Sequence, residues 1–349
     1  MPTRACGRRS ALLLALCSLL AGCARVGALA ASVPASAPLL GPAPSVSVGA
    51  DDVTLLRSGP ATFATIASLI GSAHSSVHIE MYEFGRDDLA NEVIAAHARG
   101  VDVTVIDDPS ELNSAATTQR LRMNDVDVVD YPVRKLMIDH VKLLVVDGSI
   151  AVVGGINWGV ASVANHDYDA LIRGPAVHNL DRVFERDLVT CGRFAAVTDP
   201  VPDPAILVAA TLPATDIRPL ALAMLEHAHT SLSLELFVLT DTGIVHALEA
   251  AHQRGVSIHV LLDPSQGSSE PSAAALAAAG VPPRLYRSHG ELLHAKAIVA
   301  DSGAILFGSA NWSGGGFARN HEVDIELPSS PAIAAQMEAQ MTLDWNASA

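Results

Sequence analysis

Basic residues are scarce in this chain. Its 349 residues include 22 lysines and arginines against 37 aspartates and glutamates, so the formal net charge at pH 7 is −15. Proteins that hold a polyanion by general electrostatics rely on clustered lysine and arginine. Aromatic residues make up only 4% of the chain, and they form no stripe interleaved with basic residues. The composition therefore disfavours a nucleic-acid-binding surface, although it is compatible with a local basic pocket.

Cysteine is also rare, with four residues in the whole chain. Two of them fall in residues 1–22, where three arginines precede a short apolar run. This arrangement predicts a secretory signal peptide, which is removed from the mature protein. The run ends at Leu20-Ala21-Gly22-Cys23, which resembles a bacterial lipobox. In a lipobox Cys23 would carry the lipid and become the new N-terminus. The alternative is an ordinary signal peptide cleaved within residues 28–32.

A lipid on Cys23 would leave Cys191 without a cysteine partner, so we expect no internal disulfide. We expect the protein to be exported and anchored to a bacterial membrane through that lipid. Because Ala24 and not aspartate follows the cysteine, the outer membrane or cell surface is favoured, with a periplasm-facing position as the alternative. Residues 23–50 are rich in Ala, Pro, Ser and Gly without a regular period, which predicts a flexible tether.

One polar pattern occurs twice, about 154 residues apart. The segments 140–158 and 294–312 align without a gap, and His, Lys, Asp, Gly, Asn and Trp fall in register. The shared residues are polar and reactive, whereas the spacers are interchangeable apolar residues. This selective agreement indicates a duplication and not a chance match.

The repeat extends on both sides of this pattern. Upstream, residues 76–109 match residues 231–264, and each segment reads as a strand, a helix ending in Arg-Gly, and a second strand ending in Asp-Pro. Downstream, residues 165–177 parallel residues 320–332. The strand-helix-strand order predicts a right-handed βαβ unit, and hence a mixed or parallel sheet covered by helices.

We therefore expect an α/β protein with two duplicated halves, residues 51–200 and 201–349, each a mixed sheet flanked by helices. Three prolines in residues 197–205 interrupt any regular element and mark the boundary. If the halves pack about a pseudo-two-fold axis, both copies of the motif meet in one site at the interface. The sequence gives no sign of the oligomeric state.

Each copy of the motif places a histidine beside a lysine. Residues i and i+2 of a strand point to one face, so His140 and Lys142 project together, as do His294 and Lys296. A lysine can hold negative oxygens, and a neutral histidine can attack phosphorus or move a proton near neutral pH. If the two pairs meet, one histidine serves as nucleophile and the other as acid, with two lysines around one phosphate.

Two pairs of acidic residues also match across the halves. Asp147 and Asp301 follow the histidines by seven residues and lie at a predicted turn, so we expect them to brace the site without contacting substrate. Glu80 and Glu235 lie on predicted inward-facing strands. A buried carboxylate needs a partner, so we expect a structural hydrogen bond there.

The chain resembles the phospholipase D superfamily, whose signature is HxKxxxxD followed by a small-residue turn and an asparagine. That pattern appears here as His140, Lys142, Asp147, Gly154, Gly155 and Asn157, and again as His294, Lys296, Asp301, Gly308, Ser309 and Asn311. The resemblance covers roughly residues 51–349. It implies two α/β halves with the active site between them, and covalent phospho-histidine catalysis without a metal or other cofactor. The absence of other His/Cys/Asp clusters with metal-ligand spacing agrees with this implication.

The resemblance also assigns roles. In members with two motifs the nucleophile is usually the N-terminal histidine, which is His140 here. His294 would protonate the leaving alkoxide and later activate water or an acceptor alcohol. The two lysines, with Asn157 and Asn311, would hold the phosphoryl oxygens and stabilise charge in the transition state.

The family further places a carboxylate after the asparagine, where it orients the catalytic imidazole through Nδ1. The matching residues are Asp167 and Glu322, and the aspartate is shorter than the usual glutamate. His166 and His321 lie inside the same Asn-His-acid triplets, where they either line the site or face away from it.

Three functions are compatible with these residues. The first is a phospholipase D-type enzyme that hydrolyses phospholipid or transfers its phosphatidyl group, and a lipid tether would hold it near that substrate. The second is an exported, metal-independent nuclease of the same superfamily, which the acidic composition disfavours. The third is a non-catalytic, membrane-attached binding protein. Decayed motifs would be expected for that function, and neither motif has lost a residue.

Overall fold

The computed structural model describes residues 43–57, 59–287 and 290–348. The predicted signal peptide, the lipidation site Cys23 and most of the predicted tether lie outside these ranges. Within the described ranges, no helix is both long enough and apolar enough to cross a membrane.

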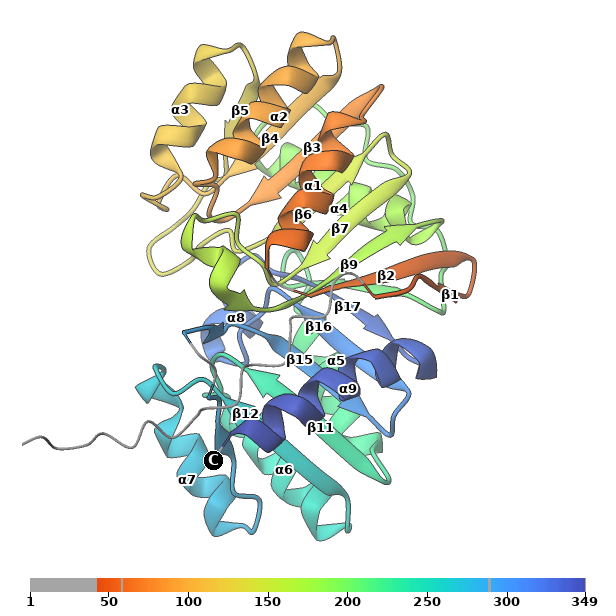
Figure 1. The fold of residues 1–349 in the computed structure, drawn as a ribbon, viewed down its shortest axis with the longest axis vertical. Helices are drawn as coiled ribbons and strands as arrows, with labels where there is room; N and C mark the ends of the chain where they lie inside the picture. The colour runs from red at the N-terminus through yellow and green to blue at the C-terminus, as the bar shows by residue number, and fades with distance from the viewer. Residues whose placement is uncertain (1–42, 58, 288–289, 349) are drawn as a thin grey trace, which may run out of the picture. The chain divides into compact units, whose positions relative to one another are not determined.

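The first half of the chain forms one eight-stranded mixed sheet with the order β1-β2-β9-β7-β6-β3-β4-β5 (Figure 1). Strands β3, β4 and β5 run parallel to one another, and β6 runs antiparallel to β3. The strands are β1 (Val46–Val48), β2 (Asp51–Arg57), β3 (Ser76–Met81), β4 (Asp102–Asp107), β5 (Asp127–Asp130), β6 (Lys142–Val146), β7 (Ile150–Gly154) and β9 (Tyr168–Arg173).

The second half repeats this arrangement in a seven-stranded sheet with the order β10-β17-β16-β15-β11-β12-β13. Each strand of this second sheet has a counterpart in the first sheet, and among the described strands of the first sheet β1 alone has no counterpart in the second. The strands are β10 (Leu207–Ala210), β11 (Ser231–Leu236), β12 (Ser257–Leu262), β13 (Arg284–Leu285), β15 (Lys296–Ala300), β16 (Ala304–Gly308) and β17 (Val323–Leu327). A further short pair, β8 (Asn165–His166) with β14 (Leu292–Leu293), joins the two halves in parallel.

Helices connect the parallel strands as the sequence predicts. Helix α2 lies between β3 and β4, and α6 lies between β11 and β12, so both expected βαβ units are present. Each of these helices is followed by a glycine with positive φ, Gly100 at 89° and Gly255 at 92°, which is the left-handed conformation that ends many helices. The helices are α1 (Pro60–Gly71), α2 (Asp87–Ala98), α3 (Ala115–Met123), α4 (Ala176–Thr190), α5 (Ile217–His227), α6 (Thr242–Gln253), α7 (Glu270–Ala278), α8 (Gly314–Ala318) and α9 (Pro331–Ala347), with short 3₁₀ turns at Ala161–Ala164 and Gly267–Ser269.

The central strands are apolar on both faces because both faces are covered. In β6, Leu143 and Val145 pack into a core shared by the two halves, whereas Leu144 and Val146 pack into a core of the first half alone. The shared core also takes residues from α4 and α9, one helix from each half. This explains why the strands read as continuous hydrophobic runs and not as alternating ones. The α/β fold with two duplicated halves is therefore confirmed.

The predicted tether is wrong at its C-terminal end. Residues 46–48 form strand β1, which pairs antiparallel with β2 at the edge of the first sheet. Ala43 is buried, and the side chain of Gln336 donates a hydrogen bond to the carbonyl of Pro44. The Ser-Val alternation in this stretch has the period of a strand, but its small residues resemble a linker by composition. The folded body thus includes residues 43–50.

The stretch between α4 and β10 contains no helix or strand, and its residues are described throughout. The predicted division between the halves at residue 200 falls within it.

The aspartates of the repeated motif hold a loop at the far end of the strand. Asp147 lies in a tight turn with φ of 52°, and its carboxylate accepts hydrogen bonds from the backbone N–H groups of His74, Ser75 and Ser76 at 2.7–3.1 Å. Asp301 does the same for residues 229–231 at 2.7–3.0 Å. Both aspartates follow the last residue of their strand, whereas the lysines begin it. The expectation that these aspartates brace the site is therefore wrong about which segment they hold. They brace the start of β3 and β11 instead.

Replacing Asp147 with alanine should destabilise the fold by about 1–2 kcal/mol, a value kept low because the carboxylate is partly solvated. Burial would raise the pKa of Asp147, but the backbone N–H groups outweigh it and lower that pKa to about 2. The stabilisation should thus be complete above pH 4 and be lost as the pH falls through 2. Thermal unfolding of the wild type and of Asp147→Ala and Asp147→Asn at several pH values measures this. Equal melting temperatures for all three proteins would contradict the role.

Candidate active site

The two histidines of the repeated motif lie where the halves meet. The backbone N–H of His140 donates to the carbonyl of His321 at 2.8 Å, and that of His294 donates to the carbonyl of His166 at 2.9 Å. Each bond joins one half to the other. All four predicted histidine and lysine residues are buried, with 2–6% of their surface exposed. Burial lowers the pKa of His140, and the charges of Lys142, Lys296 and His294 lower it further.

The orienting carboxylates cross the interface. Glu322, from the second half, lies 2.8 Å from Nδ1 of His140 in the first half. Asp167, from the first half, lies 2.9 Å from Nδ1 of His294 in the second half. The shorter aspartate therefore reaches its histidine as closely as the glutamate does. Each half supplies the acid that orients the other half's imidazole.

The contacts around His140 fix its tautomer. Nδ1 faces two acceptors, the Glu322 carboxylate and the carbonyl of Ser309 at 3.1 Å, so Nδ1 carries the hydrogen. Burial, together with the charges of Lys142 and Lys296, holds the pKa of His140 well below its usual range. The ring is therefore neutral, and Nε2 keeps a free lone pair for attack on an electrophile.

His294 lies in a more negative environment. Burial lowers its pKa, but Asp167 opposes that effect. Burial would raise the pKa of Asp167, yet His294 and Lys296 outweigh it and keep that pKa below its usual value, so this carboxylate is ionised. Glu322 differs, because burial raises its pKa to about 7. Of the two imidazoles, His294 is thus the one with a fully charged partner for its protonated form.

The two lysines lie beside their own histidines. Lys142 Nζ donates to the carbonyl of His140 at 2.6 Å. Lys296 Nζ donates to the carbonyl of His294 and lies 2.9 Å from that residue's Nδ1. Burial lowers the pKa of Lys142 to about 7 and that of Lys296 to about 8. An anionic ligand would stabilise their charged forms.

Each asparagine sits on a turn held by a buried aspartate. The carboxylate of Asp169 accepts from the N–H of Ile156, next to Asn157, and Asp324 accepts from the N–H of Ala310, next to Asn311. Burial raises the pKa of both aspartates to about 8. The side-chain oxygen of each asparagine is buried without a hydrogen-bond partner among the described residues. Each amide therefore has hydrogen-bonding capacity that the described residues do not use.

The small residues of the motif leave room for these carboxylates. A Cβ on Gly154 would lie 2.3 Å from Oδ1 of Asp169, and one on Gly308 would lie 2.3 Å from Oδ1 of Asp324. A Cβ on Gly155 would lie 2.5 Å from Oδ1 of Asp167. Glycine is thus required where the strand passes the acids of the site.

Sequence reasoning missed two aromatic residues and the paired aspartates. The ring of Tyr82 packs edge-on against His140 at 4.9 Å, and Phe237 packs against His294 at 4.8 Å. Each ring also lies 5.2 Å from the ammonium group of the lysine in its half. Both aromatics follow strands β3 and β11 directly, and Asp169 and Asp324 come two residues after the orienting acids. These residues occupy matching positions in the two halves, so aligning the repeat could have identified them.

The crossed arrangement makes a testable prediction about tautomers. Glu322→Gln should perturb the imidazole of His140, because its Nδ1–H loses a carboxylate acceptor, and should leave His294 in its wild-type tautomer. Asp167→Asn should have the reverse effect. Nitrogen-15 NMR of the histidine side chains reports the tautomer directly. A change confined to the histidine in the same half as the substitution would contradict the crossing.

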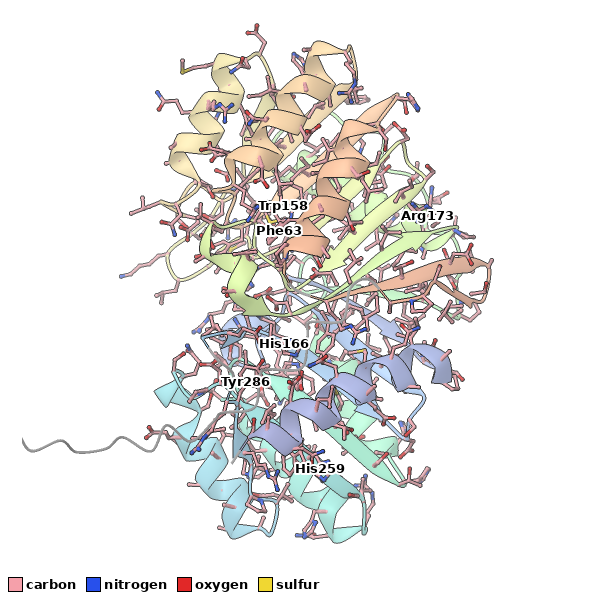
Figure 2. All side chains as sticks on the ribbon, viewed as in Figure 1. Phe63, Trp158, His166, Arg173, His259 and Tyr286 are labelled. Carbon is pink, nitrogen blue, oxygen red and sulfur yellow. The ribbon has the colours of Figure 1, made fainter. Side chains whose placement is uncertain are left out.

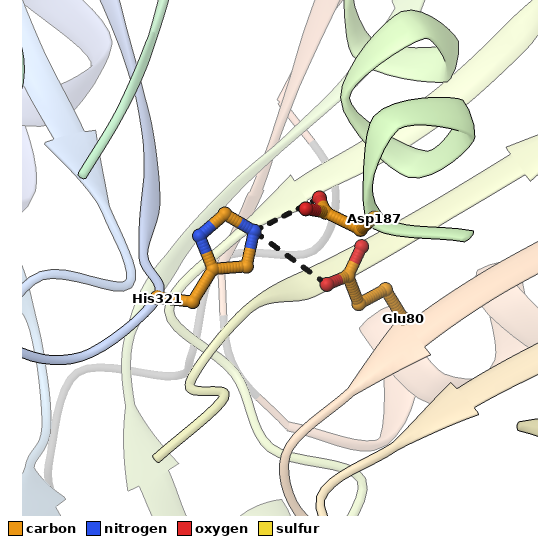
Figure 3. Close-up of side chains that lie close together, drawn as sticks. All are labelled: Glu80, Asp187 and His321. Carbon is orange, nitrogen blue, oxygen red and sulfur yellow. Dashed lines mark hydrogen bonds and ion pairs between the residues drawn. The ribbon is translucent and has the colours of Figure 1, made fainter. Parts of the chain in front are cut away.

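Two further buried clusters lie beside the crossing segments. In the first, Nε2 of His321 lies 2.9 Å from Asp187 and 3.7 Å from Glu80 (Figure 3). His321 comes from the second half, whereas β3 and α4 of the first half supply the acids. The ring of His321 stacks on Tyr131 at 5.4 Å. We call His321, Asp187 and Glu80 the first triad.

The second triad mirrors the first with the halves exchanged. Nε2 of His166 lies 2.9 Å from Glu235 and 3.4 Å from Asp344, and the hydroxyl of Tyr168 donates to Glu235 at 2.9 Å. His166 and Tyr286 stack with ring centroids 5.7 Å apart (Figure 2). The hydrogen bond expected for Glu235 is present, with His166 and Tyr168 of the opposite half as its partners. The hydrogen bond expected for Glu80 is not: both of its carboxylate oxygens lack a hydrogen-bond partner among the described residues, and His321 lies 3.7 Å away because its Nε2 is bonded to Asp187 instead.

The second triad should make stability depend on pH. Burial would lower the pKa of His166, but Glu235 and Asp344 outweigh it and raise that pKa to about 9. The protonated ring therefore stabilises the fold fully below pH 6.5, and this contribution is lost as the pH rises through 9. It amounts to up to about 3 kcal/mol.

Chemical denaturation of wild type and His166→Gln from pH 6 to pH 9.5 tests this. The difference in the free energy of unfolding should be largest at pH 6 and shrink toward pH 9.5. A difference that grows with pH would contradict the raised pKa.

The comparisons with known proteins agree with this geometry. A family model described as cardiolipin synthase, PLD-like domain, matches residues 66–188 and 221–345, one match in each half. Cardiolipin synthase A of Pseudomonas putida is 27% identical over 332 residues, which cover 84% of this chain and 68% of that protein. Cardiolipin synthase of Geobacillus thermodenitrificans is 26% identical over 318 residues, covering 80% of this chain and 63% of that protein.

A solved structure shares the fold. Phosphatidylserine synthase of Haemophilus influenzae superposes with a TM-score of 0.67 at 12% identity, covering 88% of this chain and 89% of that one. Two α/β halves, each bringing the histidine and lysine of an HxKxxxxD motif to their interface, define an enzyme of the phospholipase D superfamily. Within it, the chain belongs to the cardiolipin synthase, PLD-like domain family.

Proposed function

We propose that this protein is a phosphatidyltransferase or phospholipase of the phospholipase D type, acting on phospholipid through a phospho-histidine on His140. The observation that carries the assignment is the unequal pair of crossed carboxylates. His140 is neutral with a free Nε2, while His294 has an ionised carboxylate at Nδ1. One imidazole is thus suited to attack and the other to proton transfer.

In the first step, Nε2 of His140 forms a bond to phosphorus while the bond from phosphorus to the leaving oxygen breaks. The leaving alkoxide takes a proton from His294, whose protonated form Asp167 stabilises. The bound phosphate itself favours that form, because its negative charge replaces solvent beside the ring. Lys142, Lys296 and the asparagine amides hold the non-bridging oxygens and stabilise the added charge.

In the second step, the acceptor gives its proton to the now neutral His294 and attacks the same phosphorus. The bond to Nε2 of His140 breaks, and the free imidazole is restored. Water as the acceptor gives hydrolysis, and an alcohol gives transfer. The curated relatives are named cardiolipin synthases, so a glycerol hydroxyl or phosphatidylglycerol is the acceptor we propose to test first.

The predicted export and the lipid on Cys23 stay predictions from the sequence. If they hold, the tether would keep the site within reach of a membrane and raise the local concentration of lipid substrate.

In the assay, the purified protein is incubated with vesicles of phosphatidylglycerol in one reaction and with single-stranded DNA in another. Both reactions contain EDTA. We expect release of the headgroup or its exchange for an added alcohol, and no cleavage of DNA. DNA cleavage without lipid turnover would instead support the nuclease. If neither substrate is turned over, the protein is better explained as a non-catalytic binding protein.

His140→Ala and His294→Ala should each lower lipid turnover by roughly a thousandfold or more, because both steps need both rings. His97→Ala is the matched control, since His97 lies at the end of α2, away from the interface. Substantial turnover by either catalytic variant would contradict the assigned roles.

A further inference from the structure

His321 ties one segment of the second half to the first half at three places. Its carbonyl accepts the N–H of His140 at 2.8 Å, and its own N–H donates to the carbonyl of Ile138 at 2.8 Å. Its ring reaches Asp187 and Glu80. The backbone contacts fix the position of the segment, and the ring contact fixes its rotation about the chain.

The next residue in that segment is Glu322, which orients His140. Only one peptide bond separates the anchored ring of His321 from the Cα of Glu322. Rotation of the segment would therefore move the carboxylate relative to Nδ1 of His140. His166 has the same relation to Asp167, and its carbonyl accepts the N–H of His294 at 2.9 Å.

We propose that His321 and His166 are positioning residues, each of which holds the acid that orients one catalytic imidazole in the opposite half. The inference rests on the proposed function for its kinetic consequence, but its structural part stands without it. The first triad acts on His140 and the second acts on His294. Loss of one or the other should therefore impair different steps of the reaction.

Burial and pairing make these anchors strong. His321, Glu80, His166 and Glu235 each expose 1% of their surface or less. If the buried ring lost its acid partner, a polar group would be left in the interior without a hydrogen bond or an opposite charge. Rotation of the segment away from the observed position is therefore costly in free energy. Burial raises the pKa of Glu80 well above its usual range, which disfavours a second charged carboxylate beside Asp187.

The same donor atoms could hold a metal ion. In each triad one histidine nitrogen and two carboxylate oxygens lie within 4.8 Å of one another. Nδ1 of His321, however, is buried without a hydrogen-bond partner among the described residues, whereas a metal-bound histidine usually donates from its other nitrogen. We therefore assign a proton and not a metal to the first triad.

The kinetic experiment uses an aryl phosphodiester, whose leaving group needs no proton, and traps the phospho-enzyme by rapid quench. His321→Phe keeps the stacked ring but removes both nitrogens. It should slow formation of the phospho-enzyme by roughly tenfold to a hundredfold, by analogy with the loss of a residue that orients a metal-bound imidazole. His166→Phe should form the phospho-enzyme at close to the wild-type rate and break it down more slowly, so that the intermediate accumulates.

The matched control is His78→Phe. His78 contacts Asp181 at 2.6 Å and stacks on Phe184, but all three residues belong to the first half and touch neither crossing segment. It should leave both steps unchanged. His321→Gln, which restores an N–H donor toward Asp187, should recover part of the lost rate. The proposal would be overturned if each triad variant slowed both steps equally and the loss of rate followed the loss of melting temperature. That result would show a merely structural role.

NMR separates this proposal from the proposed function. If the wild type turns over no diester, the function fails, but the tautomers of His140 and His294 can still be read. His321→Phe should disturb the Nδ1–H signal of His140 alone, and His166→Phe that of His294 alone. Unchanged signals in both variants would overturn the positioning role. Stoichiometric metal in the purified protein, lost in Asp187→Asn, would overturn the assignment of a proton to the first triad.

Discussion

The site depends on two short segments that cross from one half of the protein to the other. Each carries an Asn-His-acid triplet, and each places its acid 2.8–2.9 Å from the motif histidine of the opposite half. The backbone of each histidine is hydrogen-bonded to the same crossing segment. Neither half can therefore complete its own imidazole. The large apolar core shared by β6, β15, α4 and α9 keeps the halves in the register that this exchange requires.

Near-symmetry does not make the two halves equivalent. Glu322 has a raised pKa and Asp167 a lowered one, although both are fully buried carboxylates at Nδ1 of a histidine. The difference lies in their surroundings. Lys296 lies 4.0 Å from Asp167, and the charges of His294 and Lys296 lower the pKa of that acid, whereas the histidine beside Glu322 is the neutral His140. A duplicated site can thus place two chemically identical side chains in unlike electrostatic surroundings, which the proposed division between attack and proton transfer requires.

Much of the fold could be predicted from the sequence. Strand-helix-strand order, the glycines at 100 and 255 and the repeat itself led to the two α/β halves, because each signal is local. The pairing of His140 with Lys142 followed from the two-residue period of a strand. The crossing of Glu322 to His140 could not be predicted, since it depends on how two distant segments pack. The tether boundary was missed because β1 is built from small residues, and the motif aspartates were misplaced because a strand separates them from the site.

The buried lysines have a consequence for ligand binding. With pKa values of about 7 and 8, both lysines are only partly protonated near neutral pH while no anion is bound. A phosphodiester entering the site would stabilise the ammonium form of both, so its binding should draw protons from the buffer. The measured heat of association would then vary with the ionisation enthalpy of that buffer, and affinity for the anion would weaken in alkaline solution.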